Sequence, residues 1–429
     1  MSFTEVPIGA AFDVFNGATP ASGEPAYWDG DIPWVGPADL GKLSIRYIAG
    51  GGRSITQEGF SSCGTQMVPA GTIILSIRAP IGHMAIASQP MCFNQGCRGL
   101  VPRSMVRTDF AYWSLLSRKP QLEAAGQGTT FIELGRDKLR AERIPLPDLA
   151  TQKAIADFLD REIARIDQLI EKKKRLVELL GKKQKAFATE TATGANHPGR
   201  SITGLGQLPL APSHWRVCRV ATVFKESFEM GGEDLPVLSV SINWGISDRE
   251  LDDEDRHRIV TYIQDRSAYK RVRVGDLVYN MMRAWQGAFG VAKVDGLVSP
   301  AYVVARPTEK IHAPYFEHLL RTPMWIEEFR RASKGIADFR QRLYWEHFRQ
   351  VRIILPPFEE QVHIADQIAV NAAAVKEVLA PIATSIDRLR EFRSALITAA
   401  VTGRIDVATW SKQGQTDRQL DEIEEAMQP

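Results

Sequence analysis

The segment "IPLPDLATQKAIADFLD" at residues 144–160 holds two prolines, a glutamine and then a run with the spacing of a helix. The same order returns in "IILPPFEEQVHIADQIA" at residues 353–369. Gln152 and Gln361 occupy equivalent positions and are 209 residues apart. A fixed offset of this length indicates a duplicated module and not a short repeat unit of a solenoid.

Each junction opens a long run with heptad spacing, which ends at "TATG" (191–194) or at "AVTG" (400–403). Apolar positions recur there in alternating steps of four and three. Because the two stripes share one register, helices 148–194 and 357–403 are predicted to pair as an antiparallel coiled coil. Pro381 predicts a kink or break in the second helix. The seam residues are Leu159, Ile163, Ile166, Ile170, Val177, Leu180, Val375, Leu379, Ile386, Leu389 and Leu396.

The segments that precede the two helices correspond as well. "VPAGTIILSIRAPIGHMAIAS" (68–88) is similar to "VRVGDLVYNMMRAWQGAFGVAK" (272–293), with a glycine before an apolar run and a loop containing an arginine after it. The fold class is therefore predicted as α+β: two mixed α/β domains, two long helices and an internal pseudo-twofold repeat. The remaining predicted segments are domains at 1–147 and 215–356, a Gly/Pro/Ser-rich linker at 195–214, and an acidic, disordered tail at 404–429.

Composition places the 429-residue chain among ordinary globular proteins, with 44% hydrophobic and 24% charged residues. No run of about 18 apolar residues and no secretory leader is visible, so we expect a cytoplasmic protein without a membrane partner. The four cysteines fit neither a disulfide framework nor a zinc site. A net charge of +2 favours no partner by itself, although it can conceal local basic patches.

Motifs for catalysis are incomplete. "GPADLGKL" (36–43) lacks the Ser or Thr that a phosphate loop needs after its lysine, because Leu43 stands there. "LPPF" (355–358) has Leu355 where amino methyltransferases need an Asp or Asn side chain. No histidine pair has the spacing of a helical metal site. The sequence therefore predicts a chain that is not an enzyme and holds no metal or cofactor of its own.

Two loop regions combine the side chains that suit nucleic acid. Residues 256–283 carry seven basic residues against two acidic ones, with tyrosines between them. Arginine can pair with guanine, and asparagine or glutamine with adenine, through two hydrogen bonds. The alternative is an ordinary solvated, charged face. The candidate DNA contacts are Lys42, Arg78, His83, Asn94, Gln95 and Arg98 in the first domain, and Arg271, Arg273, Arg283, Trp285, Gln286 and Lys293 in the second.

Taken together, the sequence resembles the specificity subunit of type I restriction–modification enzymes over about residues 1–405. The resemblance rests on the two proline–glutamine junctions, on "TATG" and "AVTG", on "GATPASGEPAYWDGDIPWVGPADL" (17–40) and on "LPLAPSHWRV" (208–217). The first junction departs from the family pattern, with Ala150 and Thr151 where two glutamates are usual.

The resemblance implies a function that composition alone does not. Each domain would recognise one half of a split site in double-stranded DNA, with the helices as spacer. The expected partners are two modification subunits, which bind S-adenosylmethionine, and restriction subunits, which use ATP and Mg²⁺. Two alternatives remain at this stage: a self-contained DNA-modifying enzyme with undetected motifs, and a coiled-coil scaffold that binds no nucleic acid.

Overall fold

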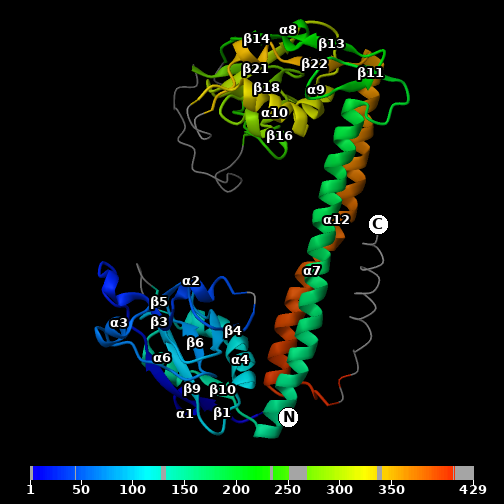
Figure 1. Ribbon diagram of the computed structural model, residues 1–429. Coiled ribbons are helices and arrows are strands. Elements are labelled where there is room, and N and C mark those ends of the chain that lie inside the picture. The colour runs from blue at the N-terminus through cyan, green and yellow to red at the C-terminus, as the bar shows by residue number, and fades with distance from the viewer. Residues whose placement is uncertain are drawn as a thin grey trace. The chain divides into compact units, whose positions relative to one another are not determined.

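The structure is a computed structural model that describes residues 3–43, 45–126, 132–231, 235–250, 268–335, 341–408 and 410. Contacts divide the chain into two compact units, Met1–Leu176 with Ile382–Pro429, and Val177–Pro381. The boundary crosses both long helices, α7 (Leu149–Thr193) and α12 (Phe358–Val401). Each unit therefore consists of one α/β domain together with a portion of each helix (Figure 1).

The first domain is built around a five-stranded sheet in the order β2-β9-β6-β7-β4, beside a three-stranded sheet β5-β3-β8 and the pair β1-β10. Its strands are β1 Glu5–Pro7, β2 Phe12–Asn16, β3 Trp28–Val35, β4 Tyr47–Ile48, β5 Arg53–Ile55, β6 Ile73–Ser76, β7 Met84–Ala87, β8 Cys92–Phe93, β9 Cys97–Pro102 and β10 Arg143–Pro145. Its helices are α1 Ile8–Ala11, η1 Pro25–Tyr27, α2 Pro37–Leu40, α3 Gln57–Ser61, α4 Thr108–Ser117, α5 Lys119–Ala124 and α6 Arg136–Ala141.

The second domain has a four-stranded sheet, β14-β21-β18-β19, and four two-stranded pairs, β11-β12, β13-β22, β15-β16 and β17-β20. Its strands are β11 Arg200–Ile202, β12 Leu210–Pro212, β13 Arg216–Arg219, β14 Phe224–Ser227, β15 Val240–Ser241, β16 Gly245–Ile246, β17 Lys270–Val272, β18 Leu277–Asn280, β19 Phe289–Val291, β20 Gly296–Val298, β21 Tyr302–Pro307 and β22 Arg352–Leu355. Its helices are α8 Val220–Val223, η3 Ala284–Gln286, α9 Ala313–Leu320, α10 Pro323–Ala332 and α11 Trp345–Phe348.

The sequence repeat is a repeat of topology. The order β2-β9-β6-β7 in the first sheet returns as β14-β21-β18-β19 in the second, with antiparallel neighbours throughout. In both domains the opening strand pairs with the strand that enters the junction: Glu5 lies opposite Pro145, and Arg216 opposite Leu355. The two ends of each domain thus meet where its long helix begins.

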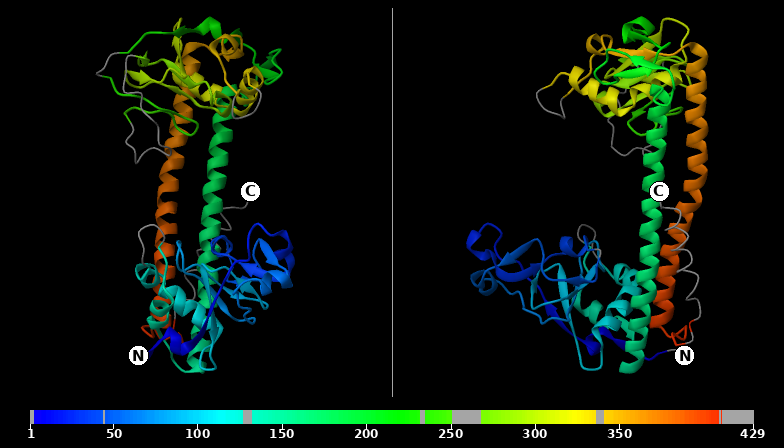
Figure 2. Two further views of the ribbon diagram at one scale, coloured as in Figure 1. Left: turned by 90° about the vertical axis from the view of Figure 1, so that its left-hand side faces the viewer. Right: turned by 45° about the vertical axis from the view of Figure 1, so that its right-hand side comes forward.

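The two long helices pack against each other within each unit, as predicted. In the first unit, Ile155, Leu159, Ile163, Ile166 and Ile170 of α7 share a core with Ile386, Leu396 and Ala400 of α12. In the second unit, Ala188 and Ala192 of α7 pack with Ile364 and Ile368 of α12. The start of one helix meets the end of the other in each case, so the pairing is antiparallel (Figure 2). The seam residues are buried or half-buried, none of them exposed.

The repeated glutamine explains the repeated junction. Gln152 is fully buried, accepts a hydrogen bond from the Arg107 amide at 2.8 Å and donates to the carbonyls of Met105 at 2.9 Å and Pro147 at 2.8 Å. Gln361 accepts from the His312 amide at 2.9 Å and donates to Pro356 at 2.8 Å. Arg107 and His312 are the N-cap residues of α4 and α9. An amide can serve such donor and acceptor groups at once, so each glutamine ties its domain to its long helix.

Two details differ from the sequence-based predictions. Residues 195–214 are not an open linker, because they form the pair β11-β12 and bury Leu205, Leu208 and Ala211 in the second domain's core. The predicted tail begins with an ordered part, since Ile405, Val407 and Trp410 pack on the core of the helix pair. Its remaining residues, 411–429, lie outside the described residues, as do Arg256, Arg258 and Arg266 of the predicted basic stretch.

Helix α12 departs from expectation in two further respects. The helix continues through Pro381 without interruption, so the predicted break is absent. The kink at Pro381 stays a prediction. By length and composition alone α12 is also apolar enough to cross a membrane, with a mean hydropathy of 1.2 over its most apolar window. Only 6% of that window is buried. This observation is weak support for a membrane span, but it shows that α12 carries apolar side chains that the described residues leave uncovered.

Candidate nucleic-acid interface

Four predicted side chains of the first domain gather at one edge of its sheet. Strands β2 and β6 end at this edge and β9 begins there, because β9 is antiparallel to both. Asn94 donates to the Thr19 hydroxyl at 2.7 Å and accepts from the Gly96 amide at 2.6 Å. We call this group the first loop cluster: Thr19, Arg78, Asn94, Gln95, Arg98 and Glu133.

Arg98 is the member of the first loop cluster whose surroundings disfavour its positive charge. Burial, followed by the nearby cations Arg136 and Arg78, lowers its pKa, although Glu133 opposes the shift. Its Nε is buried and, within the part of the chain that the structure describes, has no hydrogen-bond partner. Glu133 lies 2.8 Å from Arg78 and 3.9 Å from Arg98, and so holds both guanidinium groups in place. An anion or a base edge with acceptor atoms would be attracted by the positive charge that Glu133 neutralises only in part.

The corresponding edge of the second sheet carries the second loop cluster: Phe228, Asn280, Arg283, Trp285, Gln286 and Tyr302. Its backbone is fixed by short-range bonds. Asn280 accepts from the Met282 amide at 2.9 Å, and Trp285 donates to the Met282 carbonyl at 3.0 Å. Gly287 closes the turn with a φ of 92°, which side chains other than glycine rarely adopt. Gln286 is exposed, Arg283 is half-buried, and Phe228 is 67% exposed.

Arg273 precedes β18 and Lys293 follows β19, so both lie at the end of these strands opposite to Arg283, whereas Arg271 follows Lys270 in β17. Arg273 pairs with Glu229 at 2.7 Å, and Arg271 with Asp295 at 3.4 Å. Hydrogen bonds from Arg273 and then from Arg306 lower the pKa of Glu229 to about 2. These arginines therefore belong to an internal ion-pair network. Tyr269 and Tyr279, which punctuate the same basic stretch in sequence, are buried in the core.

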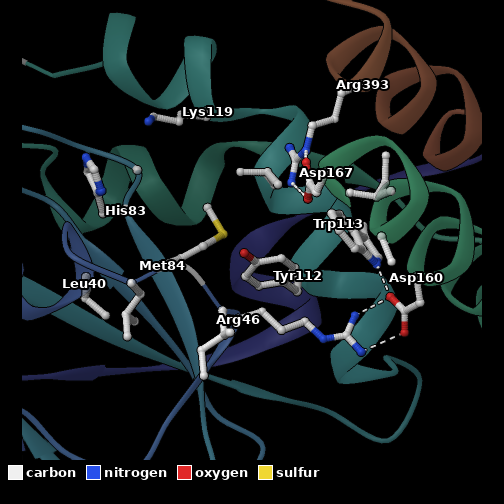
Figure 3. A pocket seen from close by; sticks show the side chains of 16 residues that line it. Leu40, Arg46, His83, Met84, Tyr112, Trp113, Lys119, Asp160, Asp167 and Arg393 are labelled. Atoms are coloured by element: carbon white, nitrogen blue, oxygen red, sulfur yellow. Dashed lines mark hydrogen bonds and ion pairs between the residues drawn. The ribbon is translucent and has the colours of Figure 1, made fainter. Parts of the chain in front are cut away.

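Within the described residues, the side chains of His83 and Lys42 form no hydrogen bond or ion pair with the first loop cluster; the His83 backbone bonds to Ser76 at the end of β6. His83 lines a cavity of about 450 Å³ within the first unit, across from the helix pair (Figure 3). Burial and then the neighbouring Lys119 lower the pKa of His83. Asp160 in this cavity binds Arg46 through both carboxylate oxygens, one of them at 2.7 Å, and accepts from the Trp113 indole at 2.8 Å. The cavity is thus a joint between domain and helix, while Lys42 is an exposed side chain on the loop beside it.

Sequence reasoning missed several members of the two clusters. Thr19 and Glu133 are distant in sequence from Arg78 and Asn94, and Phe228 precedes the second basic stretch. Lys270, one of the seven basic residues of the predicted stretch, lies at the second cluster too: its ammonium donates to the Tyr302 carbonyl at 2.9 Å and lies 5.5 Å from the Phe228 ring centre. The signal that could have found Thr19 and Phe228 is the equivalence of β2 with β14, which they follow. Across the described ranges, no group of three or more His, Cys, Asp or Glu side chains is placed to hold a metal ion.

Comparisons with known proteins agree with this arrangement. Residues 2–179 match the model of the type I restriction modification DNA specificity domain. The chain is 38% identical over 172 residues to the type I restriction enzyme MjaIX specificity subunit of Methanocaldococcus jannaschii, covering 40% of this chain and 39% of that one. It is 23% identical over 385 residues to the type I restriction enzyme EcoBI specificity subunit of Escherichia coli, covering 86% and 80%.

The fold also has a solved counterpart. A chain from a structure described as the basis of complex assembly and conformational transition of the type I R-M system superimposes with a TM-score of 0.64 at 17% identity, covering 94% of this chain and 98% of that one. The architecture is thus that of a two-domain protein with paired helices. Residues 2–179 are similar to the type I restriction modification DNA specificity domain, and parts of the chain are similar in sequence to type I specificity subunits. The match with the Methanocaldococcus relative spans less than half of that relative's length.

Proposed function

We propose that this chain is the DNA-recognition subunit of a type I restriction–modification complex. Each domain binds one half of a split site in double-stranded DNA, and the paired helices serve as the spacer. The observation that carries the proposal is the repetition of a loop cluster at the same edge of both sheets, each with an arginine and an amide side chain. Such side chains recognise base edges in the major groove.

The chemistry of modification is assigned to other subunits. The relatives are named as specificity subunits, a name that states no catalytic role. Within this proposal the chain itself catalyses nothing, two modification subunits bring S-adenosylmethionine, and restriction subunits use ATP and Mg²⁺ for cleavage. The whole assembly would act on DNA in the cytoplasm. Partial neutralisation of the first cluster by Glu133 fits a protein that must not bind all DNA tightly.

The test is to purify the chain with modification subunits encoded beside its gene and to map the methylated adenines. We expect a motif of two specified halves around an unspecified spacer. Arg283→Ala or Gln286→Ala should relax one position of the second half, because a lost bidentate base contact costs roughly 1–3 kcal/mol. Asn94→Ala should relax the first half in the same way.

Arg273→Ala is the matched control for Arg283→Ala, since it removes the same side chain from the same domain but at the other end of β18. It should leave both half-sites unchanged. Equal effects of the two substitutions would show that the second loop cluster does not contact bases. A neighbouring gene set without a methyltransferase, or an undivided motif, would contradict the proposal itself.

A further inference from the structure

A backbone hydrogen bond recurs beside the loop cluster of each domain. In the first domain, the Leu134 amide donates to the Ile77 carbonyl at 2.8 Å. In the second domain, the Leu343 amide donates to the Met281 carbonyl at 2.9 Å. The two leucines are buried and lie 209 residues apart, which is the offset of the whole repeat. The residues just before them therefore occupy equivalent positions, next to the segment that carries the arginine of each cluster.

These two equivalent residues carry opposite charges. The first domain has Glu133 at this position, whereas the second domain has Arg342, which is exposed. Oε2 of Glu133 accepts from Nε of Arg78 at 2.8 Å, and Oε1 lies 3.9 Å from the Arg98 guanidinium. The repeat thus exchanges a hydrogen-bond acceptor for a donor at one place in its loop cluster.

A second exchange accompanies the first. Strands β9 and β21 both have six residues and end at a proline opposite the first residue of β2 or β14, so Arg98 and Val303 are equivalent. The Arg98 side chain is only 13% exposed, and Val303 is buried in the core. Where Arg342 replaces the carboxylate of Glu133, a valine therefore replaces the buried cation beside it. Because a buried charge needs a partner, this pattern indicates that Arg98 and Glu133 belong together.

Arg78 and Glu133 present a donor and an acceptor side by side. Arg78 is 45% exposed, and its bond to Glu133 uses Nε, so that bond leaves both terminal nitrogens available to donate. Glu133 is 34% exposed, and a carboxylate has about four acceptor positions. In the major groove, guanine offers two acceptor atoms and its paired cytosine offers an amino group. The two side chains thus match the two bases of one G·C pair.

We propose that Glu133 is a specificity-determining residue, which accepts a hydrogen bond from the amino group of a cytosine while Arg78 donates to the paired guanine. Arg98 is a positioning residue that holds the carboxylate. At the equivalent position of the second domain, Arg342 donates to a guanine of the other half-site. The inference rests on the proposed function and adds to it one base pair of the first half-site and a residue that makes the two half-sites differ.

Glu133→Gln is the decisive substitution, because an amide keeps the size of the side chain and one acceptor but adds a donor. The complex with the modification subunits encoded beside the gene is used to map methylated motifs. Wild type should require a C·G pair in the first half. Glu133→Gln should lower the preference for cytosine there roughly tenfold and raise that for adenine, which an amide contacts through two hydrogen bonds.

A purely structural role of Glu133 predicts a different motif. If the carboxylate only held Arg78 in place, Glu133→Gln would relax the position to all four base pairs without a gain of adenine, and this result would overturn the inference. Glu123→Gln is the matched control, since it removes the same charge from a glutamate that pairs with Lys119 at 3.7 Å outside the cluster. It should keep the wild-type motif, and a change equal to that of Glu133→Gln would also refute the proposal.

Two further variants test the exchange between the domains. Arg342→Ala truncates an exposed side chain and should relax one guanine of the second half alone, so an unchanged second half would refute the equivalence. Glu133→Arg combined with Arg98→Val should replace cytosine by guanine in the first half, and retention of cytosine would count against the proposal. An undivided wild-type motif would contradict the proposed function, whereas a divided motif that Glu133→Gln leaves unchanged would contradict this inference alone.

Discussion

Replacing Gln152 by leucine removes the amide that ties the first domain to its long helix. The substitution keeps the volume of the side chain nearly constant but abolishes three hydrogen bonds, of 2.8, 2.9 and 2.8 Å, in a fully buried place. A hydrogen bond contributes about 1 kcal/mol net, and a buried group left without a partner costs roughly 1–3 kcal/mol. We therefore expect Gln152→Leu to destabilise the first unit by about 3 kcal/mol.

Hydrogen exchange followed by mass spectrometry is the suitable assay, because a chain with two units need not unfold in one step. A loss of about 3 kcal/mol raises the population of the open state roughly a hundredfold, since each 1.4 kcal/mol is a factor of ten. Amides of α4 and of the start of α7 should exchange faster by this factor, while amides of the second unit keep their rates. Gln361→Leu should accelerate exchange in the second unit less, because two hydrogen bonds are lost in place of three.

Gln121→Leu is the control for Gln152→Leu, an exposed glutamine in the same unit, and should change little. If Gln152→Leu and Gln121→Leu behaved alike, the glutamine would not hold domain and helix together. If Gln152→Leu instead destabilised both units equally, the hydrogen bonds of Gln152 would not act on the first unit alone. The two units would then not unfold independently of each other.

Three further predictions concern charge, thiols and length. The pKa of Glu229 is lowered from 4.5 to about 2, so its ion pairs stabilise the second domain above pH 4.5 and are lost towards pH 2; Glu229→Gln should flatten this part of an acid titration followed by circular dichroism. Burial raises the pKa of Cys92 to about 11 and of Cys97 to about 12, so a thiol reagent at pH 8 should label Cys63 in the native chain but these two only after unfolding. Four residues inserted after Gln184 should preserve the facing of a domain and lengthen the helix by about 6 Å, which adds one or two base pairs to the unread spacer of the methylated motif. Two inserted residues should turn the domain away and abolish recognition, whereas an unchanged spacer in the longer variant would refute a spacing role.

The sequence was sufficient for the architecture because the decisive signals are periodic and repeated. The seam from Leu159 to Ile170 is a local pattern, and its counterpart from Ile368 to Leu379 occurs in the same register. Each long helix was therefore predicted from its own pattern and again from the matching pattern of the other helix. The hairpin in residues 200–212 was missed because glycine and proline hid the few apolar residues, such as Leu205 and Leu208, that bury it.

The candidate site was predicted less well, for a geometric reason. Arg273 and Arg283 are ten residues apart in sequence, but the four residues of β18 lie between them. A strand rises about 3.3 Å per residue, so β18 alone separates the two side chains by about 13 Å and places them at opposite ends of the sheet. The sequence analysis grouped Arg273 with Arg283 because they are close in sequence, although β18 separates them in the fold. Glu133 could not be found either, since its link to Arg78 spans 55 residues without a pattern.

The same geometry separates the glutamine junction of each domain from its loop cluster. Strand β9 begins at the first loop cluster and ends beside Met105 and Arg107, which bind Gln152. Its six residues span about 20 Å. Strand β21 likewise begins at Tyr302 of the second loop cluster and ends shortly before His312, whose amide donates to Gln361. Because the sheet holds the loops and the glutamine at opposite ends, side chains in the loops can change without disturbing the hydrogen bonds that fix each domain to its helix.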